Sequence, residues 1–265
     1  MPATSVLAAI NDDIGGAWRL EQRMTGGLLG GAWRVNDGST AAVLKWHDPS
    51  SDVPRNPDAP AVVEHIRIAG YPTPAWLASG TTPQGFAWSI QELVEGEPSL
   101  HLDATAARRV LDLVRLQRTI CPPTAMSWTT FMRDTVATAP PDLRMLAAPY
   151  ESAALPDDEM VHCDLSLSNI IFRDGKVTGV VDIDATGRGC AVYDLLNVAL
   201  NGLTWNAEPD ALALLHEYAL DTYERAARDD RSDVSRGRGL AWGSAHRSDR
   251  SDELGIMYRT WLRSF

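Results

Sequence analysis

The residues best suited to chemistry gather in one stretch of the sequence, from Val161 to Asp184. Asp164 lies in its polar first half, Asn169 opens an apolar run, and Asp182 ends a second apolar run. The two runs are joined by a turn that contains Asp174-Gly175, a pair typical of tight β-hairpins. A hairpin would bring Asn169 and Asp182 together at one end. Amide and carboxylate oxygens that converge beside a further carboxylate suit Mg²⁺ shared with the phosphates of a substrate.

The order of these residues resembles a known catalytic core. The pattern H-x-D-x-x-x-x-N, followed by an apolar strand and an Asp, is similar to that of the aminoglycoside phosphotransferase family, relatives of choline kinase and the protein kinases. The resemblance implies that Asp164 accepts the proton of a substrate hydroxyl and that Asn169 and Asp182 hold Mg²⁺. It also implies that His162 braces the loop and that Asp194 ties the following helix to it.

Three features nearer the N-terminus fit a nucleotide site. Gly26, Gly27 and Gly30 lie between two strand-like runs, where backbone N–H groups could cover phosphates. The order of these glycines departs from the kinase G-x-G-x-x-G, and a flexible hairpin is the alternative interpretation. Lys45 ends an apolar run and resembles the kinase lysine that grips the α- and β-phosphates. By the same resemblance, Glu64 in the next predicted helix pairs with Lys45.

A strand-like run that ends at Val94 continues into Glu95-Gly96, and this segment resembles the hinge between the two lobes of the family. The resemblance implies that the carbonyl of Glu92 and the amide of Val94 bond the base of the nucleotide. Backbone readout leaves no side-chain signature, so ATP and GTP remain alternatives.

The resemblance also implies the fold class, which is α+β with two protein kinase-like lobes. An antiparallel β-sheet lobe would occupy residues 1–94 and a mainly helical lobe residues 95–265, with the hinge at about 91–98. Apolar spacing predicts a long amphipathic helix that Asp103 caps at its N-terminus. The helical patterns of the second lobe cover residues 103–120, 128–136, 141–150, 193–203 and 210–227.

Other polar residues of the second lobe have less specific interpretations. Asp184 could assist the metal, meet a cationic substrate or be a turn acid. Trp205 and Glu208 could hold the acceptor substrate, together with aromatic and acidic residues of the tail at 240–265, or could be ordinary core and surface. The acidic run at 156–159 is predicted to be solvated. Relatives commonly carry Gly-Asp-Pro where this chain has 189–191, so how that loop is braced is an open question.

The composition of the chain argues against several classes of protein. The chain has 265 residues and a formal net charge of -11, which argues against binding to nucleic acid or to an anionic membrane. Its three cysteines are too few for a disulfide framework and fit a reducing cytoplasm. No stretch is long enough to cross a bilayer, and the N-terminus lacks the basic region of a signal peptide. Monomer and dimer are both open.

The sequence therefore predicts a Mg²⁺-dependent kinase that uses ATP or GTP to phosphorylate a hydroxyl of a small molecule. Given the family, an antibiotic is the expected acceptor, for resistance or self-resistance. A metabolite kinase acting on choline, homoserine or a sugar is one alternative. A catalytically weak, pseudokinase-like nucleotide-binding module is another, because the glycine loop is irregular.

Overall fold

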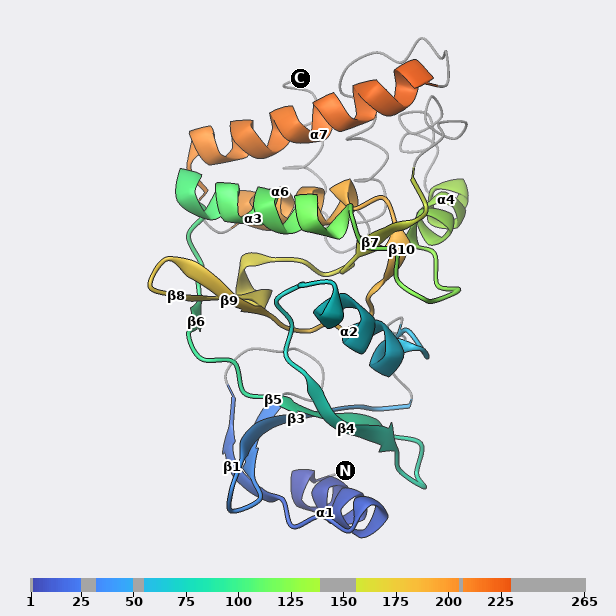
Figure 1. The fold of residues 1–265 in the computed structure, drawn as a ribbon, viewed down its shortest axis with the longest axis vertical. Coiled ribbons are helices and arrows are strands. Elements are labelled where there is room, and N and C mark those ends of the chain that lie inside the picture. The colour runs from blue at the N-terminus through green and yellow to red at the C-terminus, as the bar shows by residue number, and fades with distance from the viewer. Residues whose placement is uncertain (1, 25–31, 50–54, 139–155, 205–206, 230–265) are drawn as a thin grey trace.

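A computed structural model describes residues 2–24, 32–49, 55–138, 156–204 and 207–229, and these form two lobes (Figure 1). A β-sheet with one covering helix makes up most of the first lobe, and helices dominate the second. The predicted α+β class with a sheet-bearing N-terminal lobe is confirmed. The glycine loop with Gly26, Gly27 and Gly30, the helix expected at 141–150, Trp205 and the tail at 240–265 lie outside the described residues.

The sheet of the first lobe has five antiparallel strands in the order β1-β2-β3-β5-β4. Side chains of β3 alternate strictly: Ala42, Leu44 and Trp46 are buried, and the odd-numbered residues are only partly buried. Helix α1 (Ala3–Ile14) packs on the buried face and completes a first hydrophobic core. The strands are β1 (Arg19–Arg23), β2 (Ala32–Asn36), β3 (Ala41–His47), β4 (Trp76–Thr81) and β5 (Ala87–Glu92). The alternation leaves Lys45 on the face opposite to this core.

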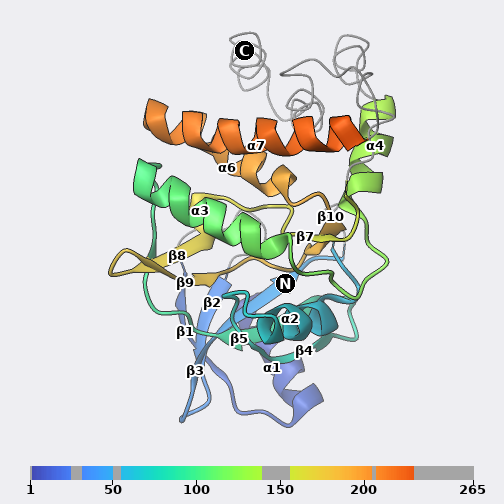
Figure 2. The same ribbon diagram turned by 45° about the horizontal axis from the view of Figure 1, so that its top comes forward.

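Helix α2 (Ala59–Ile68) lies between the sheet and the second lobe (Figures 1 and 2). Its buried side chains Val62, Val63 and Ile66 belong to the hydrophobic core of the second lobe rather than to that of the first. The helix therefore precedes β4 and β5 in the chain but is anchored in the other lobe.

The second lobe is built on three packed helices, α3 (Ala104–Gln117), α6 (Val192–Thr204) and α7 (Pro209–Asp229), with α4 (Trp128–Thr138) at one end. The predicted cap of α3 is confirmed, because the Asp103 side chain accepts a hydrogen bond from the Ala106 amide at 2.7 Å. No helix among the described residues is long and apolar enough to span a membrane.

Two small sheets carry the loops of the second lobe. The predicted hairpin is confirmed as β8 (Ile170–Arg173) and β9 (Lys176–Val180), with Ile170 opposite Val180. Asp174 and Gly175 form its turn with φ of 53° and 70°, the left-handed conformation that a two-residue hairpin turn requires. The remaining elements are β6 (Glu97–Pro98), β7 (Glu159–Val161), the 3₁₀ turn η2 (Leu167–Asn169) and β10 (Gly187–Gly189). Strand β6 pairs with β8, and β7 pairs with β10.

Gly96, in the connection between the lobes, has a steric reason to be glycine. Its φ is 128°, and an added Cβ would lie 2.4 Å from the carbonyl oxygen of Phe172 on β8. Gly38 also has a positive φ, 100°, but a Cβ there would meet nothing within 4 Å. We therefore expect Gly38→Ala to lower the free energy of unfolding by only about 1–2 kcal/mol, and Gly96→Ala by about 3 kcal/mol or more. Urea denaturation of both variants measures the difference, and equal losses would contradict a tight approach at Gly96.

Candidate active site

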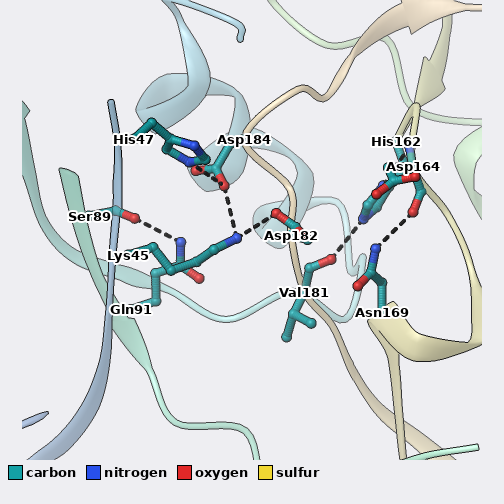
Figure 3. A network of polar contacts seen from close by, with 10 residues as sticks. All are labelled: Lys45, His47, Ser89, Gln91, His162, Asp164, Asn169, Val181, Asp182 and Asp184. Atoms are coloured by element: carbon teal, nitrogen blue, oxygen red, sulfur yellow. Dashed lines mark hydrogen bonds and ion pairs between the residues drawn. The ribbon is translucent and has the colours of Figure 1, made fainter. Parts of the chain in front are cut away.

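The loop between β7 and β8 presents Asp164 to solvent. The Asp164 side chain is exposed, while its carbonyl accepts a hydrogen bond from Asn169 Nδ2 at 2.9 Å (Figure 3). This bond spans the spacing of the sequence motif and fixes the orientation of the Asn169 amide. The amide oxygen, Oδ1, takes no part in this bond. The Val181 amide donates to the Asn169 carbonyl at 2.9 Å, so Asn169 lies beside the residue that precedes Asp182, as the hairpin predicted.

The buried residues His162 and Asp194 hold this loop in place from the protein interior. His162 is fully buried, and its Nδ1 accepts from the Asp164 amide at 3.3 Å. Its Nε2 therefore carries the proton and donates to the Val181 carbonyl at 2.9 Å. Asp194, also fully buried, accepts from the His162 amide at 2.6 Å and from the Cys163 amide at 2.9 Å. These are the contacts of braces, not of groups that meet a substrate.

The surroundings of Asp194 act on the pKa of its carboxyl group in opposite directions. Burial raises the pKa of Asp194 to about 6, although hydrogen bonds from the His162 and Cys163 backbone amides and from Gln117 favour the charged form. The Cys163 backbone between these bonds has φ of 77°, an unusual value for a residue other than glycine. The brace therefore holds the residue before Asp164 in a conformation that it would rarely adopt alone.

Lys45 of β3 crosses from the first lobe to two acids of the second (Figure 3). Its Nζ lies 2.5 Å from Asp182 Oδ1 and 3.1 Å from Asp184 Oδ2. The two acids differ in environment, because the side chain of Asp182 is 42% exposed and that of Asp184 only 11%. The φ of Asp182 is 65°, so the backbone turns sharply just after the end of β9, where Asp182 and Asp184 contact the lysine. Lys45 and Asp182, distant in sequence, are therefore direct neighbours.

The charges of this group support one another. Burial opposes the charge of Lys45, but Asp184 and Asp182 outweigh it and raise the pKa of the lysine. Burial likewise opposes the charge of Asp184, but Lys45 and His47 outweigh it and hold the pKa of that carboxyl well below its usual range. His47 Nε2 lies 3.4 Å from Asp184 Oδ2. Asp184 is thus the buried anion of the group, and Asp182 is the acid that remains accessible.

The expected ion pair between Glu64 and Lys45 is not formed. Glu64 instead pairs with Arg67 at 3.5 Å, and its side chain is 65% exposed. The reason is the orientation of α2: Val62, Val63 and Ile66 face the second core, so Glu64 lies on the solvent side. Asp184 takes the position of buried partner to the lysine. Because Asp184 lies only two residues after Asp182, the sequence could have indicated that both acids reach the same lysine.

Other predicted site residues are placed less directly. The Glu92 carboxylate accepts from the Ala75 amide at 2.9 Å, which ties the end of β5 to the segment before β4. Val94 packs against Gly179, where an added Cβ would lie 2.6 Å from Val94 Cγ1. The base contacts of Glu92 and Val94 stay predictions. Glu208 lies 3.4 Å from His101 Nε2, at the start of α7.

The acidic run before β7 was wrongly predicted to be wholly solvated, because Glu159 is buried. Glu159 Oε2 accepts from the Ala191 amide at 2.9 Å, and its Oε1 accepts from Arg118 Nε at 3.0 Å. Pairing of β7 with β10 adds to this hold. Glu159 therefore braces the loop at 189–191, whose support the sequence left open.

A hollow of about 290 Å³, open to solvent, borders the loop of Asp164. It lies between η2, the end of α6 and the residue before Asp103. Leucine side chains supply apolar walls, while serine and asparagine supply polar groups. The lining residues are Leu102, Ser166, Leu167, Ser168, Asn201 and Gly202.

A lysine from a five-stranded lobe that meets an acid of a helical lobe, beside an exposed aspartate and an oriented asparagine, defines a phosphotransferase of the kinase-like class. Comparison with protein families agrees. The chain belongs to the phosphotransferase enzyme family named APH, whose family model matches residues 22–228.

Solved structures of this fold cover nearly the whole chain. Aminoglycoside phosphotransferase APH(4)-Ia has a TM-score of 0.64 at 14% identity, over 99% of this chain and 96% of that one. The amicoumacin kinase hAmiN, in complex with AMP-PNP, Ca²⁺ and Ami, has a TM-score of 0.62 at 10% identity, over 99% and 95%. APH(3'')-Id from Streptomyces rimosus, in complex with ADP and streptomycin, has a TM-score of 0.52 at 22% identity, over 93% and 99%. No curated protein sequence matches significantly. At these identities the comparison shows the shared fold.

Proposed function

We propose that this phosphotransferase moves the γ-phosphate of ATP or GTP to a hydroxyl group of a small-molecule antibiotic, in the cytoplasm and with Mg²⁺. The observation that carries the proposal is the contact of Lys45 with Asp182 across the two lobes, beside the loop that presents Asp164. Phosphoryl transfer requires mainly alignment and charge neutralisation from the protein, and this group of residues can supply both.

The residues present fit a magnesium ion. The accessible Asp182 carboxylate and the Oδ1 of Asn169 are hard oxygen donors, and the bond from the Val181 amide to the Asn169 carbonyl brings the backbones of the two residues close together. Mg²⁺ held there would neutralise charge on the phosphates of the nucleotide. Lys45, kept charged by the buried Asp184, would bind phosphate oxygens from the side of the first lobe.

Asp164 has the environment of a general base. Its carboxylate is exposed, so an acceptor hydroxyl can reach it, while its backbone is fixed by His162 and Asn169. A fixed carboxylate can orient the hydroxyl and accept its proton as the bond to phosphorus forms. His162 and Asp194 then act only through the position of the loop.

The choice of an antibiotic as acceptor is supported by the ligands bound in similar structures, which are hygromycin B, streptomycin and Ami. The hollow beside Ser166 and Asn201 offers both apolar and hydrogen-bonding walls for part of such a molecule. A choline, homoserine or sugar kinase is the second candidate within the same chemistry, and a nucleotide-binding module of weak activity is the third.

Mass spectrometry of reaction mixtures tests the proposal. The protein is incubated with ATP or GTP, with Mg²⁺ or with EDTA, and with panels of hydroxylated antibiotics and of metabolites. We expect one antibiotic class to gain a phosphate only when Mg²⁺ and nucleotide are both present. Phosphorylation confined to metabolites would support the second candidate. Binding of nucleotide with no transfer to any acceptor would favour the third.

A further inference from the structure

The turn that follows Asp182 is held from outside by an unusual set of hydrogen bonds. Three consecutive carbonyl groups, those of residues 184–186, each accept a bond from another part of the chain. The backbone amide of Asn56 donates to the Asp184 carbonyl at 3.0 Å, and its side-chain Nδ2 donates to the Thr186 carbonyl at 2.6 Å. The carbonyl between them, of Ala185, accepts from Trp128 Nε1 at 2.9 Å. Asn56 therefore makes two of these three bonds.

Asn56 is well fixed itself. It is only 3% exposed, and its Oδ1 lies 2.9 Å from the Asp58 amide and 3.1 Å from Thr124 Oγ1. Its carbonyl accepts from the Ala59 amide at 3.1 Å, at the start of α2. Because buried side chains of α2 pack in the core of the second lobe, Asn56 joins the turn after Asp182 to a helix anchored in that core.

We propose that Asn56 is a positioning residue for the metal-binding acid. Asp182, with φ of 65°, adopts a conformation that persists only when the surrounding structure imposes it. The two bonds from Asn56 impose it from the residues just after the acid, and so set where the carboxylate of Asp182 lies. Loss of the side chain leaves the buried Thr186 carbonyl without its donor, and the turn relaxes to satisfy it. This inference rests on the proposed function.

The experiment measures the affinity of ADP for the full chain by calorimetry, with Mg²⁺ and with EDTA. We expect Asn56→Ala to weaken binding of ADP with Mg²⁺ by about tenfold or more, the usual effect of losing a residue that orients a metal ligand. Binding of ADP in EDTA should change by less than about twofold, since Lys45 remains. Asn56→Asp keeps the acceptor for Thr124 but removes the donor to Thr186, so it should behave like Asn56→Ala and replaces it if that variant does not fold.

Asn11 provides a matched control in the first lobe. Its side chain also joins two backbone groups, donating to the Trp18 carbonyl at 2.8 Å and accepting from the Trp18 amide at 3.0 Å. Asn11→Ala should lower the melting temperature but leave the effect of Mg²⁺ on ADP affinity unchanged. Normal binding by both Asn56 variants, or equal losses with Mg²⁺ and with EDTA, would overturn the positioning role alone. If the affinity of the wild-type protein for ADP is the same with Mg²⁺ and with EDTA, the proposed metal site is overturned as well.

Discussion

Replacing Asp164 with asparagine is expected to lower the rate of phosphoryl transfer by about 10²–10⁴-fold, the usual contribution of a general base. The asparagine has nearly the same shape, and the backbone contacts of residue 164 with His162 and Asn169 do not involve the side chain that changes. Binding of ADP with Mg²⁺ should therefore stay within about threefold of wild type. Steady-state kinetics and calorimetry on one preparation separate the two effects.

Asp158 offers a control for the loss of an exposed acid in the same lobe. Asp158→Asn should transfer phosphate at the wild-type rate. A turnover number for Asp164→Asn close to that of the control would remove Asp164 from the role of base and leave the nucleotide site intact.

The second large effect is expected at Asp184. Asp184→Asn leaves Lys45, whose side chain is 16% exposed, paired with Asp182 alone, whose side chain is 42% exposed. Breaking a buried ion pair from one side costs about 3–5 kcal/mol, and the remaining partner places this variant at the lower end, about 3 kcal/mol. Affinity for nucleotide should fall too, because the lysine is no longer fixed. Urea denaturation and ADP titration measure these losses.

Glu64→Gln is the matched comparison. Glu64 pairs only with Arg67 among the contacts of the described residues, at an exposed site, so its loss should change the free energy of unfolding by less than about 0.5 kcal/mol. The family resemblance implied instead that Glu64 is the partner of Lys45. A loss of stability for Glu64→Gln as large as that for Asp184→Asn would contradict Asp184 as the buried partner of Lys45.

Local signals in the sequence predicted local structure well. The Asp174-Gly175 pair predicted the β8–β9 hairpin, and Asp103 predicted the start of α3. His162 was expected by resemblance to brace the loop, and its Nδ1 accepts a hydrogen bond from the Asp164 amide two residues away. Each of these features depends on residues a few positions apart, so the backbone conformation alone brings them together.

The errors concern partners that tertiary packing chooses. Glu64 was assigned from its place in a helix, but which face of α2 is buried depends on the second core. Glu159 was assigned to solvent from its acidic neighbours, although Arg118 and the Ala191 amide surround it. Asn56 gave no signal at all, since it lies in a proline-rich connection and acts on carbonyls far along the chain. None of these contacts has a fixed sequence spacing.

The anchoring of α2 has a consequence for any attempt to divide this chain. A fragment of residues 1–94 produced apart from residues 95–265 would carry Val62, Val63 and Ile66 away from the core that they fill. The first fragment would expose the apolar face of α2, and the second would expose the core residues that this face covers. We expect each fragment to be insoluble or unfolded when produced alone and to gain structure only when both are co-expressed.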